Sequence, residues 1–88
     1  MRAVYLRTVF HQMSRVYAPP GSAQHDRVRL VLAQLADERR PLPGPDDQEA
    51  LRTPIETTWA RRVPGTDLVV TSSVLPLMIE VRSIHPAW

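Results

Sequence analysis

The sequence predicts an α+β protein in which two helices pack on a three- to four-stranded antiparallel sheet. Three observations lead to this class. An apolar stripe with helical spacing runs through residues 22–40, the residues from 56 onward alternate with the period of a strand, and Pro64-Gly65 fits the centre of a tight turn between two strands. A chain of 88 residues suffices for one small core, so we expect residues 1–88 to form a single domain.

Residues 1–17 allow two interpretations, a strand or a helix at residues 3–7. The apolar side chains recur at helical spacing and would form one stripe: Leu6, Val9, Phe10, Met13, Val16 and Tyr17. Alternatively, a short strand over residues 3–6 leads into a helix that begins near Thr8, which is an acceptable N-cap residue. In both cases Pro19-Pro20-Gly21 ends the helix.

The second helix follows these prolines, with Ser22 or Asp26 as its N-cap. Its buried stripe is expected to consist of Val28, Val31, Leu32, Leu35 and Ala36. We expect Arg39 and Arg40 in its last turn, where cations complement the exposed carbonyl groups, and Pro41 to end it. The proline-rich segment 41–47 is expected to be an irregular connector, followed by one helical turn over residues 48–52.

The C-terminal third is expected to form consecutive antiparallel strands. In the first, alternation places Trp59, Arg61 and Val63 on one face and Thr58, Ala60 and Arg62 on the other. A second strand covers residues 68–74, which are rich in β-branched side chains, and a turn near residues 75–76 leads into the last strand over residues 77–84. In the last strand the helices are expected to cover Leu77, Ile79, Val81 and Ser83, while Met78, Glu80, Arg82 and Ile84 face the other side.

All the basic residues besides histidine are arginine: the chain carries eleven, and its formal net charge is +2. The guanidinium group is planar and permanently charged, which suits it to phosphate groups and to stacking on bases. Several arginines lie on the predicted C-terminal strands, while acidic residues gather between Asp37 and Glu56. This uneven charge predicts an anionic ligand for the strands, and RNA is our leading candidate.

Other classes of site lack support in the sequence. Cysteine is absent, which excludes a disulfide framework and a thiolate site. The sequence contains no set of residues with metal-ligand spacing, no glycine-rich phosphate loop and no apolar run of membrane-spanning length. We therefore expect a cytoplasmic protein that needs no metal and no other cofactor.

Four stretches of the chain resemble the RelE/ParE superfamily of small bacterial toxins. They are the second helix, the step Glu49-Ala50-Leu51-Arg52, the hairpin pattern Trp59-x-Arg61-Arg62-Val63-x-Gly65, and the final apolar strand that reaches Ile84-His85-Pro86-Ala87-Trp88. The resemblance implies a short first strand, two helices and three antiparallel strands. It also implies an endoribonuclease, acting on free RNA or on the ribosome, that a cognate antitoxin holds inactive.

Carried over residue by residue, the resemblance implies catalytic roles for His85, Arg82 and Arg61. His85 would exchange a proton with the reacting ribose hydroxyl group, since imidazole titrates near neutral pH, and the arginines would neutralise the phosphate. RNA-binding roles are implied for Arg52, Arg62 and Trp88, the last by stacking on a base. Arg61 and Arg62 point to opposite faces of one strand, so only one of them can line a given groove. Glu80 shares a face with Arg82, and an ion pair between them is the alternative to a phosphate contact.

The chain departs from the family pattern in two places. Thr66-Asp67-Leu68 follows Gly65 where family members place an arginine, and His85 is followed by Pro86 instead of an arginine. Each missing donor is worth on the order of 3 kcal/mol of transition-state stabilisation. A weak nuclease, a ParE-like protein with another target and a homologue without toxic activity are therefore alternatives to an active nuclease.

A small protein-interaction module is an alternative from a different class. Leu6, Phe10, Met13 and Tyr17 give the first helix a large apolar surface for so small a core. Such a surface suits a protein partner or a homodimer. The expected partners are thus RNA or the ribosome together with an antitoxin for a toxin, and a protein alone for a module.

Overall fold

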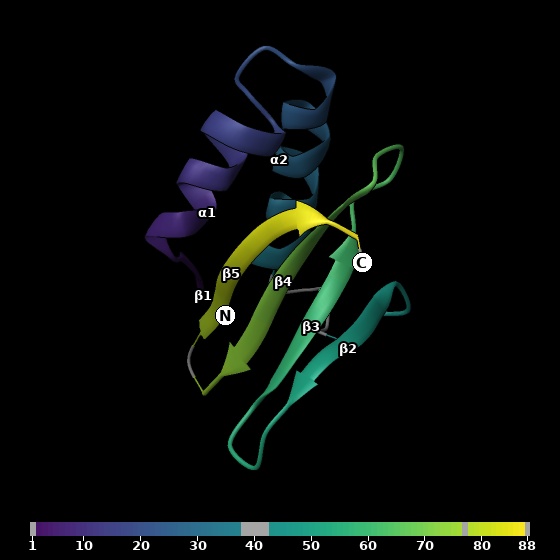
Figure 1. Cartoon of the computed structure of the whole chain (residues 1–88). Coiled ribbons are helices and arrows are strands. Elements are labelled where there is room, and N and C mark those ends of the chain that lie inside the picture. The colour runs from purple at the N-terminus through teal and green to yellow at the C-terminus, as the bar shows by residue number, and fades with distance from the viewer. Residues whose placement is uncertain (1, 38–42, 77, 88) are drawn as a thin grey trace.

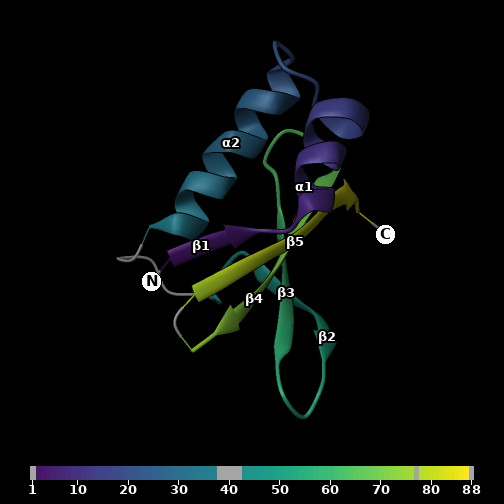
Figure 2. The same ribbon diagram turned by 90° about the vertical axis from the view of Figure 1, so that its left-hand side faces the viewer.

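The computed structural model describes residues 2–37, 43–76 and 78–87. Its elements, in chain order, are β1 (Arg2–Tyr5), α1 (Arg7–His11), the π-helical turns η1 (Gln12–Tyr17), α2 (Ala23–Ala36), β2 (Asp47–Arg52), β3 (Thr57–Arg62), β4 (Leu68–Leu75) and β5 (Met78–Pro86). The strands form one five-stranded sheet in the order β1-β5-β4-β3-β2, with α1 and α2 together on one side of it (Figure 1). Figure 2 shows β1 beside β5, directly before the chain turns up into α1.

The predicted α+β class is confirmed, but the prediction of three to four antiparallel strands is wrong. The sheet has five strands, and β1 runs parallel to β5, with Ala3 opposite Ile79. The helical turn expected over residues 48–52 is also wrong, because these residues belong to β2. Gln48 pairs with Ala60 of β3, so hydrogen bonding to a neighbouring strand overrides the local preference of this segment for a helix.

At the N-terminus the chain forms a strand and then a helix, but Thr8 is not the N-cap. Leu6 occupies that position, and the Thr8 hydroxyl instead donates to the carbonyl oxygen of Arg82 (3.4 Å). Only part of the expected apolar stripe is buried. The helical period changes in η1, where the Ala18 N–H donates to the Met13 carbonyl five residues back (3.0 Å). Val9 and Met13 enter the core, whereas Phe10, Val16 and Leu6 are exposed.

Helix α2 starts as predicted and ends earlier than predicted. The Ser22 hydroxyl accepts a hydrogen bond from the backbone N–H of His25 (3.1 Å), which makes Ser22 the N-cap. Val28, Val31 and Leu35 are buried and Leu32 is partly buried, but Ala36 is exposed at the last helical position. The residues expected to close the helix, 39–41, lie outside the described residues.

A β-bulge in β5 changes which side chains meet the helices. Thr71 of β4 lies opposite Ser83, and the next residue, Ser72, lies opposite Val81, so Arg82 is an extra residue without a partner on β4. The bulge brings Ile84 onto the same face as Val81 and turns Ser83 away, so both were assigned to the wrong side. The side-chain oxygen of Gln12 accepts a hydrogen bond from the Ile84 N–H (2.8 Å) and ties η1 to this bulge.

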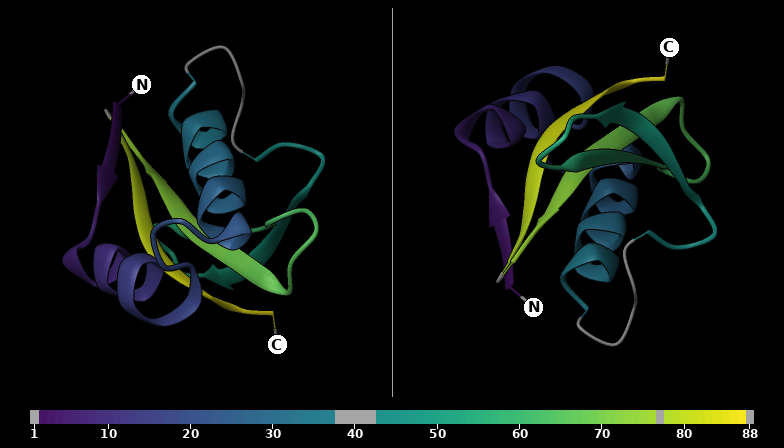
Figure 3. Two further views of the ribbon diagram at one scale, coloured as in Figure 1. Left: turned by 90° about the horizontal axis from the view of Figure 1, so that it is seen from above. Right: turned by 90° about the horizontal axis from the view of Figure 1, so that it is seen from below.

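The core lies between the two helices and one face of the sheet. It consists of Val9, Met13, Ala18, Val28, Val31, Leu35, Val63, Leu68, Val70, Val81 and Ile84. Seen from above, the helices lie in front of the sheet, and seen from below they lie behind it (Figure 3). Among the described elements, none covers the second face, which we call the helix-free face. In the described residues we also find no helix with the length and apolarity that crossing a membrane requires.

Candidate functional site

The helix-free face has a floor of small side chains, although no described helix covers it. Thr58, Ala60, Val69, Thr71 and Ser73 are each at most 8% exposed. Longer polar side chains of neighbouring residues surround them. A face of this kind, shallow in the middle and polar at its margin, is where the structure assembles the residues that could contact a ligand.

The strand register orders this face into rows. Side chains directly opposite one another in antiparallel strands point to the same side, so each row crosses β3, β4 and β5. The rows are Thr58–Ser73–Glu80, Ala60–Thr71–Ser83 and Arg62–Val69–His85. Neighbouring strands are about 4.8 Å apart, which puts the backbones of Arg62 and His85 about 10 Å apart, within reach of a shared phosphodiester group.

Arg62 stands at the edge of a hollow on this face. The hollow has a volume of 210 Å³ and is lined by Asp46, Gln48, Ala60, Arg62, Val69 and Ala87. Arg62 is exposed, and within the described ranges its guanidinium group has no ion-pair partner. The carboxylate of Asp46 in the same lining makes the hollow mixed in charge.

His85 occupies the other end of the row and is half-buried. Its Nδ1 lies 2.9 Å from the carbonyl oxygen of Pro86. A carbonyl can only accept, so Nδ1 carries the hydrogen and donates it. In the neutral ring the lone pair is then on Nε2, the nitrogen that could take a proton from a ligand.

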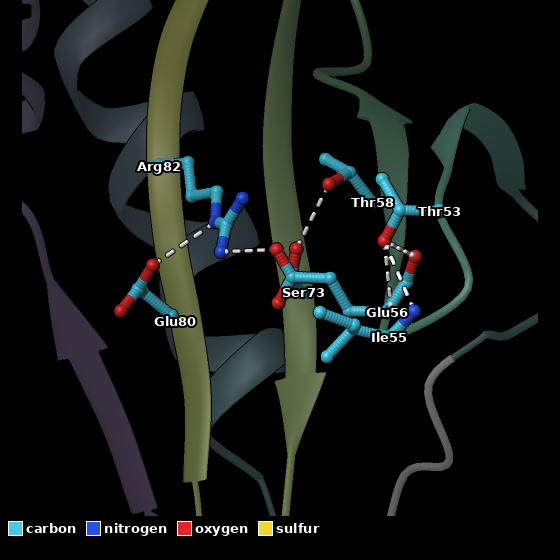
Figure 4. A network of polar contacts seen from close by, with 7 residues as sticks. All are labelled: Thr53, Ile55, Glu56, Thr58, Ser73, Glu80 and Arg82. Carbon is cyan, nitrogen blue, oxygen red and sulfur yellow. Dashed lines mark hydrogen bonds and ion pairs between the residues drawn. The ribbon is translucent and has the colours of Figure 1, made fainter.

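Arg82 lies on the same face but is held by two carboxylates. Its Nε donates to Glu80 Oε1 (3.0 Å), and its Nη2 lies 2.6 Å from Glu56 Oε1. Figure 4 shows the Glu56 side chain crossing in front of β4, over Ser73, to reach the Arg82 guanidinium group, which lies between β5 and β4, with a helix behind the sheet. The Ser73 hydroxyl below it shares a hydrogen bond with the Thr58 hydroxyl (2.9 Å). Two negative groups on one guanidinium leave this cluster with a net charge of −1.

Arg61 lies on the helix-bearing face, away from His85. It pairs with Val70, a core residue, and its guanidinium group makes two hydrogen bonds to Asp47, Nε to Oδ1 (2.7 Å) and Nη2 to Oδ2 (2.6 Å). The hydrogen bonding to Asp47, followed by its charge, raises the pKa of Arg61, although burial acts in the opposite direction. Arg61 is thus a partner of β2 and does not face the row of Arg62 and His85.

The remaining expected residues do not join the site. Arg52 is exposed and forms an ion pair with Glu49 on its own strand (3.0 Å), and Trp88 lies outside the described residues. The structure therefore brings together Arg62, His85 and the Arg82 cluster, and leaves Arg52 and Arg61 elsewhere. Glu56 was missed by the sequence analysis, because it comes from the turn between β2 and β3 and no pattern in the chain links it to Arg82.

Comparison with known proteins identifies the fold. No protein-family model matches the sequence, and no curated protein matches it at a significant level. The structure superposes on a chain of the crystal structure of the archaeal RelE–RelB complex from Pyrococcus horikoshii OT3, with a TM-score of 0.69 and 18% sequence identity, over 97% of this chain and 92% of that chain. This chain therefore has a RelE-like fold.

Proposed function

We propose that this chain is the toxin of a toxin–antitoxin pair and that it cleaves RNA on its helix-free face. The likeness to a chain solved in a RelE–RelB complex supports the antitoxin as its protein partner. The observation that carries the RNA part is the row Arg62–Val69–His85, in which a guanidinium group and an imidazole flank a small buried side chain on an uncovered face.

The residues of this row suit cleavage by the 2′-hydroxyl group of the RNA itself. Arg62 binds the phosphate oxygens, and His85 Nε2 takes the proton of the 2′-hydroxyl group. The hydroxyl oxygen attacks the adjacent phosphorus, the bond from phosphorus to the 5′-oxygen breaks, and the leaving oxygen takes a proton from water. The products are a 2′,3′-cyclic phosphate and a 5′-hydroxyl end, on free RNA or on RNA held by the ribosome.

A second candidate function is binding of a protein partner without catalysis. It is favoured by exposed apolar side chains on the helices, namely Phe10 at 58%, Val16 at 51% and Leu30 at 61% exposure. Met13 and Tyr17 do not contribute as expected, because Met13 is buried and Tyr17 packs against the core. An inactive homologue of a toxin would keep such a surface for an antitoxin.

The two functions separate when the protein is produced alone in a bacterial host. We expect wild type to arrest growth, and His85→Ala and Arg62→Ala each to reduce RNA cleavage by the purified protein about 100-fold or more, since each removes one group used at the reacting phosphate. Arg29→Ala, which removes an exposed arginine of α2, is the matched control and should leave cleavage unchanged. Harmless wild type that cleaves no RNA but binds the product of a neighbouring short gene would refute the nuclease and support the second candidate.

A further inference from the structure

We propose that Glu56 holds Arg82 in an autoinhibitory ion pair that an RNA phosphate must displace. The inference rests on the proposed function, because Arg82 lies on the helix-free face that would bind RNA. It assigns Glu56 a regulatory role that neither the fold nor the row of Arg62 and His85 requires.

The geometry of the ion pair leaves little of Arg82 for a ligand. The Arg82 side chain is 31% exposed, and those of Glu56 and Glu80 are 22% and 23% exposed, so the cluster is partly withdrawn from water. Glu80 contacts Nε from the same strand, whereas Glu56 contacts Nη2 from across the sheet, at 2.6 Å (Figure 4). A phosphodiester group carries one negative charge and approaches a cluster that is already negative. Binding therefore requires one carboxylate to leave.

Glu56 is the carboxylate that can leave, because it belongs to a turn and Glu80 belongs to a central strand. The turn is held by its own hydrogen bonds: the Thr53 hydroxyl accepts from the N–H groups of Ile55 (3.3 Å) and Glu56 (3.1 Å), and the Thr53 N–H donates to the Glu56 carbonyl (2.8 Å). Packing does not anchor it, since Ile55 at its tip is 94% exposed. The turn can thus swing away from Arg82 as a unit without opening the core.

The position of Arg82 on the face indicates what it would bind once released. Its guanidinium group lies between β5 and β4, beside the Glu56 carboxylate that is in front of Ser73, and Val69, in the row of Arg62 and His85, is four residues from Ser73 on β4. At about 3.3 Å per residue, the two places are about 13 Å apart, which is too far for one phosphate group to touch both. Released Arg82 would contact a phosphate next to the one that is cleaved. Its release should therefore strengthen RNA binding more than it changes the chemical step.

The test measures RNA binding with the chemistry disabled. Single-stranded RNA carrying a fluorescent label is titrated with full-length protein in a His85→Ala background, and anisotropy is followed at several salt concentrations. The variants are Glu56→Gln, Arg82→Ala and the two combined. Glu49→Gln is the matched control, because it also removes one negative charge from a glutamate paired with an arginine, Arg52, and leaves Arg82 untouched. Circular dichroism confirms that each variant is folded.

We expect Glu56→Gln to bind RNA about 3- to 10-fold more tightly than the background protein, and its salt dependence to steepen by about 0.7, the value for one added phosphate contact on a single strand. Glu49→Gln should show neither effect, and Arg82→Ala should abolish the gain of Glu56→Gln. Equal affinities for the two glutamine variants, or a gain that persists without Arg82, would overturn the autoinhibitory ion pair. Absence of RNA binding in all variants would overturn it too.

Failure of this inference and failure of the proposed function give different results. Cleavage is measured separately, with His85 intact. If the protein cleaves RNA but Glu56→Gln does not change its RNA affinity, the proposed function stands and only the autoinhibitory ion pair is refuted. Conversely, if Glu56→Gln tightens RNA binding through Arg82 but the protein cleaves no RNA, the autoinhibitory ion pair stands and the nuclease function is refuted.

Discussion

Replacing Asp47 by alanine should lower the free energy of unfolding far more than replacing an exposed acidic residue does. Asp47 is the first residue of β2 and lies opposite Arg61 of β3, which it binds through both carboxylate oxygens at 2.7 Å and 2.6 Å. The backbone N–H of Gly44 also donates to Oδ2 (2.6 Å), so the same carboxylate fixes the end of the connector that enters β2. The Asp47 side chain is 0% exposed and that of Arg61 11% exposed.

The magnitude follows from this burial. Removing one partner of a buried ion pair leaves the other charge without compensation, which costs about 3–5 kcal/mol. Domains of this kind have a total free energy of unfolding of about 5–15 kcal/mol, so Asp47→Ala should remove a large part of it. Glu49→Ala is the control two residues away: it breaks an ion pair whose side chains are 66% and 41% exposed, where about 0–1 kcal/mol is expected.

The raised pKa of Arg61 predicts how the effect depends on pH. A group whose pKa is higher in the folded state contributes its stabilisation fully below its ordinary pKa and loses it only as the pH rises through the raised value. Arg61 therefore contributes its full stabilisation throughout the neutral range. The difference between Asp47→Ala and wild type should be the same in mildly acidic and mildly alkaline buffer.

Urea unfolding followed by far-ultraviolet circular dichroism measures both variants. Asp47→Ala should lower the urea midpoint with an unchanged m value, and Glu49→Ala should leave the midpoint near that of wild type. Equal midpoints for the two variants would refute the reasoning. In that case the ion pair of Arg61 with Asp47 would not stabilise the fold, and Arg61 would again be a candidate for binding a phosphate group.

Two other predictions concern the scaffold around the site. Gly65 has a φ of +77°, a conformation that L-residues rarely adopt, so Gly65→Ala should cost about 1–2 kcal/mol, measured by thermal unfolding. The added Cβ atom would meet the exposed guanidinium group of Arg27, which can move, so the absence of a loss would contradict the left-handed conformation of this turn. Gln12→Ala leaves the partly buried N–H of Ile84 without an acceptor and should cost about 1–3 kcal/mol, whereas Gln24→Ala on the exposed side of α2 should cost nearly nothing. Similar losses for the two glutamine variants would show that the bulge of β5 does not depend on η1.

The elements that sequence analysis predicted well are those whose pattern is local. Helix α2 has an N-cap serine and apolar residues at helical spacing, and β3 and β4 alternate or are β-branched, so each pattern is readable within one segment. β2 was missed because its central residues, Gln48 to Leu51, favour a helix when considered alone. Their pairing with β3 supplies the hydrogen bonds that make this segment a strand, and such pairing cannot be predicted from the segment alone.

The site was harder to predict, because it depends on a bulge and on long-range ion pairs. Strict alternation correctly placed Arg61 and Arg62 on opposite faces of β3, but it could not say which of the two would share a face with His85. The expectation that only one of them lines a given groove is wrong, because both line a hollow of 310 Å³ near Pro64. In β5 the extra residue at Arg82 reverses the alternation, so the side of every later residue in that strand was assigned wrongly. No residue type marks a bulge of this kind. His85 reaches the helix-free face only because of it.

Acidic and basic residues that are separated along the sequence form ion pairs in the folded chain. Two acidic residues that precede the C-terminal strands in the sequence lie beside arginines of those strands in space: Asp47 binds Arg61, and Glu56 binds Arg82. Glu49 binds Arg52 within β2. The charges of Arg61 and Arg82, which are separated from these acidic residues along the chain, are therefore paired with them in the structure. RNA binding by this fold would depend on Arg62, which has no ion-pair partner among the described residues, and on any arginine that a phosphate can release. Under the proposed function, the strength of the Glu56–Arg82 ion pair would therefore help to set the RNA affinity, because the ion pair would decide whether the helix-free face offers an anion one guanidinium group or two.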